Sequence, residues 1–124
     1  MKANPVGWFE IPVSDMDRAR RFYEAVFQCE LEVTQMGPAE MAWFPWDGES
    51  IGSAGTLIKT EGYAPAMVGT VVYFTAPDIN AHLARIEANG GKTIVPKMSI
   101  GEHGWIAHFE DSEGNRVALH AVDG

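Results

Sequence analysis

The chain has one cysteine, no long apolar run and few basic side chains. Because Cys29 has no second cysteine to pair with, an internal disulfide is excluded, and with it the scaffold of a small secreted protein. No apolar stretch approaches the ~20 residues of a transmembrane helix, and the first residues lack the apolar core of a signal peptide. We therefore expect a cytoplasmic protein without a membrane partner.

Acidic side chains outnumber the basic ones. Nine Lys and Arg stand against 17 Asp and Glu, which gives a formal net charge of −8. Proteins that bind nucleic acids rely on Lys and Arg contacts to phosphate, so we expect no nucleic-acid partner. The charge favours neutral or cationic small molecules, although a role in solubility alone would also explain it. With 124 residues, 46% of them hydrophobic, the chain is sized for one domain, residues 1–124.

A strand, an acidic turn and a helix are predicted in succession at the start of the chain. Phe9, Ile11 and Val13 lie at every second position, which is the period of a strand. Asp15 can cap the helix that follows. The apolar residues of this helix recur at helical spacing and predict one buried face, made of Met16, Ala19, Phe22, Tyr23 and Val26.

The same pattern restarts in the second half of the chain. A strand is predicted at residues 67–75, and Asp78 is the next helix cap. An apolar helical stripe follows at Ile79, Leu83 and Ile86. This repeat of a whole supersecondary pattern divides the chain into two units of similar length.

Each unit is completed by three further strands. They are predicted at residues 31–35, 41–45 and 52–59 in the first unit, and at 92–96, 105–110 and 116–121 in the second. Asp47-Gly48 reads as a hairpin turn. The units, approximately 1–62 and 66–124, are therefore both βαβββ. Since one such unit leaves a sheet face bare, we predict an α+β fold of two tandem βαβββ units, with a curved mixed sheet, helices on its outer face and a concave cleft.

Two short strings carry a resemblance to a known family. Arg20, Phe22 and Tyr23 form an Arg-x-Phe-Tyr string after the acidic turn, and residues 111–116 read Asp-Ser-Glu-Gly-Asn-Arg. The chain resembles the vicinal oxygen chelate superfamily, which includes glyoxalase I, extradiol dioxygenases and bleomycin-resistance proteins. The resemblance implies paired βαβββ units, a cleft that binds a small molecule, and a homodimer.

The resemblance also implies a divalent metal in that cleft, held by His, Glu or Gln. Aligned on the acidic turn and the later glycines, the ligand positions fall on Trp8, Val71, Ala118 and a residue within 52–57, where side-chain oxygens are limited to hydroxyl groups. An indole, an isopropyl group and a methyl group cannot coordinate a metal. We therefore expect no metal cofactor, and metal-dependent glyoxalase or dioxygenase activity is disfavoured.

Strand alternation places a set of polar and aromatic residues on the face opposite the core. In the first strand this face carries Trp8 and Glu10, in the fifth it carries Tyr73, and in the last it carries Arg116 and His120. Aromatic walls with a few converging polar groups are typical of small-molecule pockets. The alternative is that the aromatic residues fill a closed core or a dimer contact.

The strand before the 111–114 turn is harder to place, because a shift of one residue exchanges its two faces. Pairing across this turn puts Trp105 on the cleft face and leaves His108 out of phase with His120. The predicted ligand-binding residues are then Trp8, Tyr73, Trp105 and Arg116. Glu10 and His120 would be the polar centre or the catalytic acid and base, or a structural hydrogen bond between the units.

Three functions remain open at this point. The first is a metal-free module that binds a small organic ligand, as bleomycin-resistance proteins do, with cation–π contacts to a cationic aromatic ligand. The second is a metal-free isomerase or lyase that uses Glu10 and His120. The third is an accessory protein with a vestigial cleft. Ligand binding would separate the third from the others, and turnover would separate the second from the first.

Overall fold

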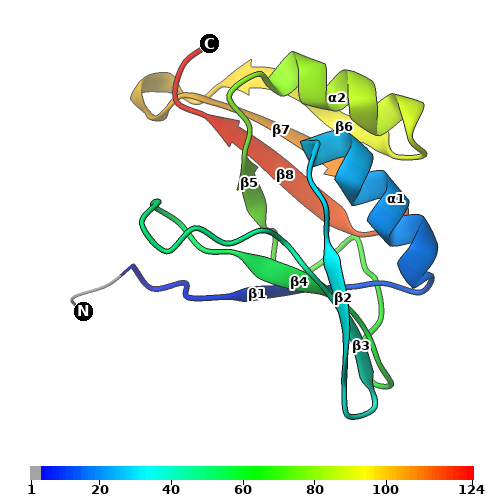
Figure 1. The fold of residues 1–124 in the computed structure, drawn as a ribbon. Coiled ribbons are helices and arrows are strands. Elements are labelled where there is room, and N and C mark those ends of the chain that lie inside the picture. Colours follow the sequence, from blue (N-terminus) through cyan, green and yellow to red (C-terminus); the bar gives the residue numbers. More distant parts are fainter. Residues whose placement is uncertain (1–3) are drawn as a thin grey trace.

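The computed structural model describes residues 4–124, which contain two α-helices, eight strands and one short 3-10 helix (Figure 1). In chain order these elements are β1 (Phe9–Pro12), α1 (Met16–Phe27), β2 (Glu32–Met36), β3 (Ala39–Trp43), β4 (Gly55–Lys59), β5 (Tyr73–Thr75), α2 (Ile79–Ala88), β6 (Lys92–Ser99), η1 (Gly101–His103), β7 (Trp105–Glu110) and β8 (Arg116–Ala121). Neither helix within residues 4–124 has the length and apolarity needed to cross a membrane.

The strands form two four-stranded sheets, in the orders β1-β4-β3-β2 and β5-β8-β7-β6. In each sheet the first strand of the unit runs parallel to the last one, and the other neighbours are antiparallel. The predicted α+β fold with two βαβββ units is therefore confirmed. Figure 1 shows two sheets that diverge toward the side on which β1 begins and β8 ends.

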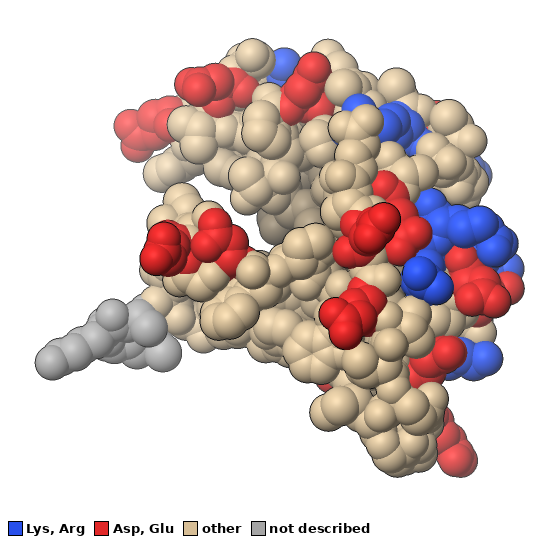
Figure 2. Space-filling model, viewed as in Figure 1, with Lys and Arg blue, Asp and Glu red and all other residues tan. Residues whose placement is uncertain are grey.

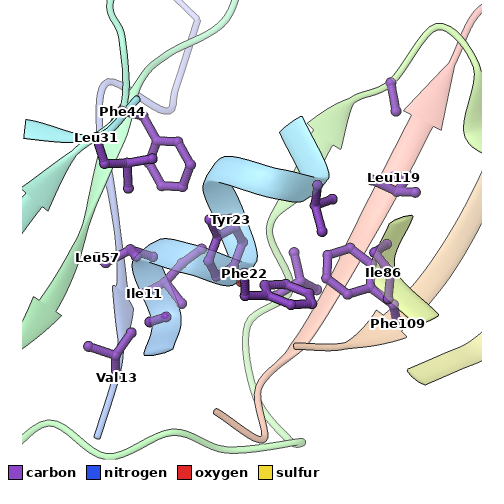
Figure 3. Close-up of a cluster of buried hydrophobic side chains, with 14 of the residues drawn as sticks. Ile11, Val13, Phe22, Tyr23, Leu31, Phe44, Leu57, Ile86, Phe109 and Leu119 are labelled. Atoms are coloured by element: carbon purple, nitrogen blue, oxygen red, sulfur yellow. The ribbon is translucent and has the colours of Figure 1, made fainter. Parts of the chain in front are cut away.

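Helix α1 joins the two sheets. Its N-cap is Asp15, as predicted, whose side chain accepts a hydrogen bond from the backbone of Arg18. The ring of Phe22 lies 6.2 Å from that of Phe109 in β7, while the ring of Tyr23 lies 5.7 Å from that of Phe44, which follows β3. Figure 3 shows these side chains of α1 between strands of the first and second sheets. One hydrophobic core therefore serves both units.

A polar cluster at the turn between β7 and β8 fixes the start of α1 to the second sheet. The Glu113 carboxylate accepts hydrogen bonds from the backbone N–H groups of Ser14 and Asp15, at 2.9 and 2.8 Å, and from Nε of Arg18 at 2.6 Å. The hydroxyl of Tyr23 donates to Asp111 at 2.7 Å. Carboxylates suit this place because the start of a helix presents unpaired N–H groups.

Several predicted boundaries are wrong in the first unit and around the linker. The tight hairpin connects β2 and β3 through Gly37-Pro38, so Asp47-Gly48 lies in the long loop 44–54 instead. Strand β4 begins at Gly55 rather than at residue 52, and β5 is confined to Tyr73–Thr75. Gly37 adopts a φ of 61°, which suits glycine in a short turn.

Candidate functional site

The faces of β1 and β8 are as alternation predicts. Ile11 and Val13 of the first unit are buried in the shared core, as are Val117 and Leu119 of the second. Glu10 and His120 therefore project from the opposite faces of their sheets. Both helices pack on the core side of the sheets, so we call the faces turned away from them the outer faces of the first and second sheets.

The predicted face of β7 is wrong. The loop between β7 and β8 has five residues, 111–115, and leaves Glu110 opposite Arg116 and His108 opposite Ala118. Trp105 therefore lies on the core side, where it packs against the hydrophobic cluster. His108 lies on the outer face together with His120, so it is in phase with His120 rather than out of phase.

The outer face of the second sheet holds a chain of three polar side chains. Tyr73 and His108 flank the small Ala118 in one row across β5, β8 and β7. The Tyr73 hydroxyl lies 3.0 Å from Nε2 of His108, and Nε of Arg116 donates to Nδ1 of the same ring at 3.0 Å. Burial, followed by the charge of Arg116, lowers the pKa of His108. Sequence reasoning missed His108, and a correct loop length would have found it.

Glu10 and His120 have separate partners within the chain. The neighbouring Glu10 carboxylate, as hydrogen-bond partner and as negative charge, raises the pKa of Tyr63. Nε2 of His120 lies 2.7 Å from the carbonyl oxygen of His103. Within residues 4–124, the two predicted acid–base residues, Glu10 and His120, therefore have different partners and do not contact each other.

A cavity of about 950 Å³ opens between the two units. Its apolar lining includes four phenylalanines, which are Phe9, Phe27, Phe44 and Phe74. Of the predicted site residues, Trp8, Glu10 and Tyr73 line this cavity, whereas Trp105, Arg116 and His120 do not. Figure 2 shows the recess between the units.

The charges around the cavity have one sign. Among the described residues that line it, Glu10 and Asp47 are the charged side chains, and no Lys or Arg takes part. In Figure 2 the largest group of Lys and Arg lies on the other side of the view, away from the recess. Hydrogen bonds from Glu49 and Ser50 lower the pKa of Asp47, so this carboxylate is ionised at neutral pH. The cavity therefore suits neutral or cationic molecules.

The residues at the expected metal positions do not fit a metal. Ala118 is fully buried, the ring of Trp8 lies tilted 5.2 Å from that of Trp43, and neither side chain offers a ligand atom. Thr56, paired with Glu10 in the register, is buried and offers only a hydroxyl. Within residues 4–124, no three His, Cys, Asp or Glu side chains gather in a way that could hold a metal ion.

Comparison with known sequences identifies the family. The sequence profile of the Glyoxalase/Bleomycin resistance protein/Dioxygenase superfamily matches residues 6–119. A glyoxylase-like domain-containing protein from Didymella fabae is 30% identical over 118 residues, which cover 92% of this chain and 91% of that protein. The chain belongs to the glyoxalase/bleomycin resistance protein/dioxygenase superfamily, as the two strings in the sequence indicated.

Solved structures show the same fold. A glyoxylase/bleomycin resistance protein/dioxygenase domain from Frankia sp. EAN1pec is similar with a TM-score of 0.73 at 16% identity, over 95% of this chain and 97% of that chain. The antibiotic-binding protein TnmS3 from Streptomyces sp. CB03234 is similar with a TM-score of 0.66 at 23% identity, over 98% of both chains. A mutant of glyoxalase I from Zea mays is similar with a TM-score of 0.70 at 20% identity, over 95% of this chain, which spans only 46% of the maize chain.

Proposed function

We propose that this protein binds a small aromatic molecule, neutral or cationic, in the cavity between its two units, without a metal. The observation that carries the proposal is a lining with four phenylalanines in which the charged groups, among the described residues, are carboxylates alone. Pockets for small organic ligands combine apolar walls with a few polar groups in this way. The fold shared with an antibiotic-binding protein supports the proposal.

The energetics favour such a ligand. An aromatic body would bury its surface against rings that are already partly exposed to the cavity, which gains ~25 cal/mol per Å² of apolar surface. A cationic group would also gain from aromatic faces such as that of Trp8, and from the negative charges of Glu10 and Asp47. An anionic group would meet two carboxylates and no compensating basic side chain in the described lining.

Cys29 provides a direct test, because it is partly exposed and lines the cavity. Three matched probes are 2-naphthylmethylammonium, 2-naphthylmethanol and 2-naphthoate. We expect the cation and the alcohol to slow alkylation of Cys29 by N-ethylmaleimide at lower concentrations than the carboxylate. Ser53→Trp, which places a large ring in the cavity, should weaken the protection, whereas Ser99→Trp on the exposed end of β6 should preserve it. Equal alkylation rates with and without all three probes would refute the proposal.

We also propose that the protein is a homodimer in the cytoplasm. Large apolar side chains are exposed at the mouth of the cavity, among them Trp46 at 71% and Ile51 at 98%. Soluble proteins seldom leave such a group uncovered, and a second copy would cover it. A monomer mass in light scattering at micromolar concentration would contradict the dimer. We further propose that residues 1–124 act as one domain, with the boundary between its two units near residues 61–66.

The alternative is a metal-free isomerase or lyase in which Glu10 and His120 act as acid and base. It has less support, because in one chain these residues contact Tyr63 and His103 rather than each other. A second copy would have to bring them together. The alternative requires turnover that is lost in Glu10→Gln and His120→Asn, while a binding protein would show no turnover in the parent.

A further inference from the structure

The outer face of the second sheet carries a second group of polar side chains that is not part of the cavity wall. It consists of Tyr73, His108 and Arg116, and only Tyr73 also lines the cavity. The parallel pairing of β5 with β8 and the antiparallel pairing of β8 with β7 place Tyr73, Ala118 and His108 in one row. Because Ala118 carries only a methyl group, the two larger side chains reach across it to each other.

The hydrogen bonds fix the proton on the imidazole. The guanidinium of Arg116 can only donate, so Nδ1 of His108 must accept with its lone pair. A neutral imidazole then carries its proton on Nε2, and this N–H donates to the Tyr73 oxygen. Burial and the charge of Arg116 lower the pKa of His108, which supports the neutral form at neutral pH. The Tyr73 hydroxyl proton is therefore directed away from the ring.

Two donors on this face have no acceptor among the residues that the structure describes. The Tyr73 hydroxyl has no further partner among residues 4–124, and its residue is 48% exposed. Arg116 forms no ion pair with the described carboxylates, although Glu110 lies opposite it in the register. A guanidinium is a permanent cation, and this one, whose single side-chain hydrogen bond within residues 4–124 goes to His108, keeps its outer N–H groups available.

We propose that Tyr73 and Arg116 form a binding site for an organic acid, with the carboxylate on Arg116 and a second acceptor oxygen on Tyr73. His108 is the positioning residue, since it holds both donors by its two ring nitrogens. Guanidinium groups recognise carboxylates through charge-assisted hydrogen bonds, which are about twice as strong as neutral ones. A carbonyl or hydroxyl oxygen on the same molecule would accept the Tyr73 proton. The site therefore selects oxo or hydroxy acids.

This site goes beyond the proposed function and is tested apart from it. The cavity favours neutral or cationic molecules, whereas this site favours an anion. Protection of Cys29 reports the cavity, while the ring signals of His108 report the outer face. Failure of either experiment therefore leaves the other conclusion standing.

Three probes of one shape separate the two contacts: 4-acetylbenzoate, 4-isopropylbenzoate and 4-acetylbenzamide. The isopropyl compound lacks the acceptor oxygen, and the amide lacks the negative charge. Titrations followed by the side-chain NMR signals of His108 should show that 4-acetylbenzoate binds about tenfold more tightly than either relative. Arg116→Gln should remove the advantage over the amide, and Tyr73→Phe should remove the advantage over the isopropyl compound.

The tautomer of His108 can be determined from the same NMR spectra. Long-range nitrogen–proton correlations should show the proton on Nε2, and Arg116→Gln should shift the tautomer population toward Nδ1–H. His108→Gln, which can still accept from Arg116 and donate to Tyr73, should keep more of the preference for 4-acetylbenzoate than His108→Leu. A proton found on Nδ1 in the parent, or equal affinities of the three probes for the parent, would overturn the proposal.

Discussion

The hydrogen bond between Tyr23 and Asp111 allows the link between α1 and the second sheet to be measured. Tyr23 is fully buried, and its hydroxyl donates to Asp111 at 2.7 Å (Figure 3 shows the Tyr23 side chain). Asp111 is itself buried and accepts from the backbone of Glu113 and from the side chain of Asn115. Tyr23→Phe removes one donor, keeps the ring and adds no polar atom.

We expect this substitution to lower the free energy of unfolding by about 1.5–3 kcal/mol, the range for a hydrogen bond to a charged group. The ring contacts should persist, because phenylalanine occupies the same volume. Urea unfolding at pH 7 gives the difference from the midpoint and the slope. Tyr63→Phe is the matched control: its hydroxyl also meets a carboxylate, that of Glu10, but Tyr63 is 48% exposed, so water can replace the lost partner and stability should change little. Equal effects of the two substitutions would refute the role assigned to the Tyr23 hydroxyl.

The same hydrogen bond predicts how the free energy of unfolding changes at alkaline pH. Burial, the charge of Asp111 and the hydrogen bond to it raise the pKa of Tyr23 well above its ordinary value. A phenol with a raised pKa in the folded state contributes stability below its unfolded pKa of about 10 and loses it as pH rises further. The advantage of the parent over Tyr23→Phe should therefore shrink by about 1.4 kcal/mol per pH unit above pH 10. An advantage that stays constant to pH 11 would contradict the burial of this hydroxyl.

Two further substitutions test the contacts that hold the turn and the last strand. Burial alone would raise the pKa of Glu113, but hydrogen bonds from Arg18 and from two backbone N–H groups hold this pKa below its ordinary value. The Glu113→Gln variant should therefore be less stable than the parent near neutral pH. Because the pKa of Glu113 is lowered in the folded state, this loss of stability should fade as pH falls below about 4. The control, Glu61→Gln on the surface, should change stability little at any of these pH values. Gly104→Ala should destabilise far more than Gly101→Ala: both glycines have positive φ, but a Cβ on Gly104 alone would collide with the carbonyl oxygen of Ala121.

Local signals predicted much of the fold. Both helices begin one residue after the predicted acidic caps, Asp15 and Asp78, because each aspartate accepts from a backbone N–H of the first turn. The apolar face of α1 is buried as its spacing indicated. These features depend on neighbours within a few positions, so the sequence alone carries enough information to place them.

The long loop 44–54 depends on more distant contacts. Asp47-Gly48 is a strong turn signal, but Gly37-Pro38 forms the hairpin because it sets β2 against β3 in the register that pairs Met36 with Ala39. The next strand then starts late, and its parallel pairing with β1 places Gly55 against Phe9. A Cβ at position 55 would meet the Phe9 ring at 2.6 Å, so glycine is required by an approach that no local pattern reveals.

The candidate site was predictable only in part for the same reason. Faces of β1 and β8 followed from alternation within each strand, whereas the face of β7 required the length of its connection to β8. A loop of five residues, 111–115, reverses the expected face and exchanges Trp105 for His108. The cavity floor brings together rings from β1, α1, the loop after β3, and β5, which only the packed structure can place.

The relation between Glu10 and His120 can be settled by a double-mutant cycle. If these residues formed a structural hydrogen bond between the units, the losses of unfolding free energy in Glu10→Gln and His120→Asn would not add in the double variant. The structure gives them separate partners, Tyr63 and the His103 carbonyl, so we expect the losses to add. The cycle is measured by urea unfolding at a protein concentration low enough to hold the monomer. A coupling above about 0.5 kcal/mol there would mean that the two side chains meet within one chain. Coupling that arises only as concentration is raised would place their contact between two copies, which the acid–base alternative requires.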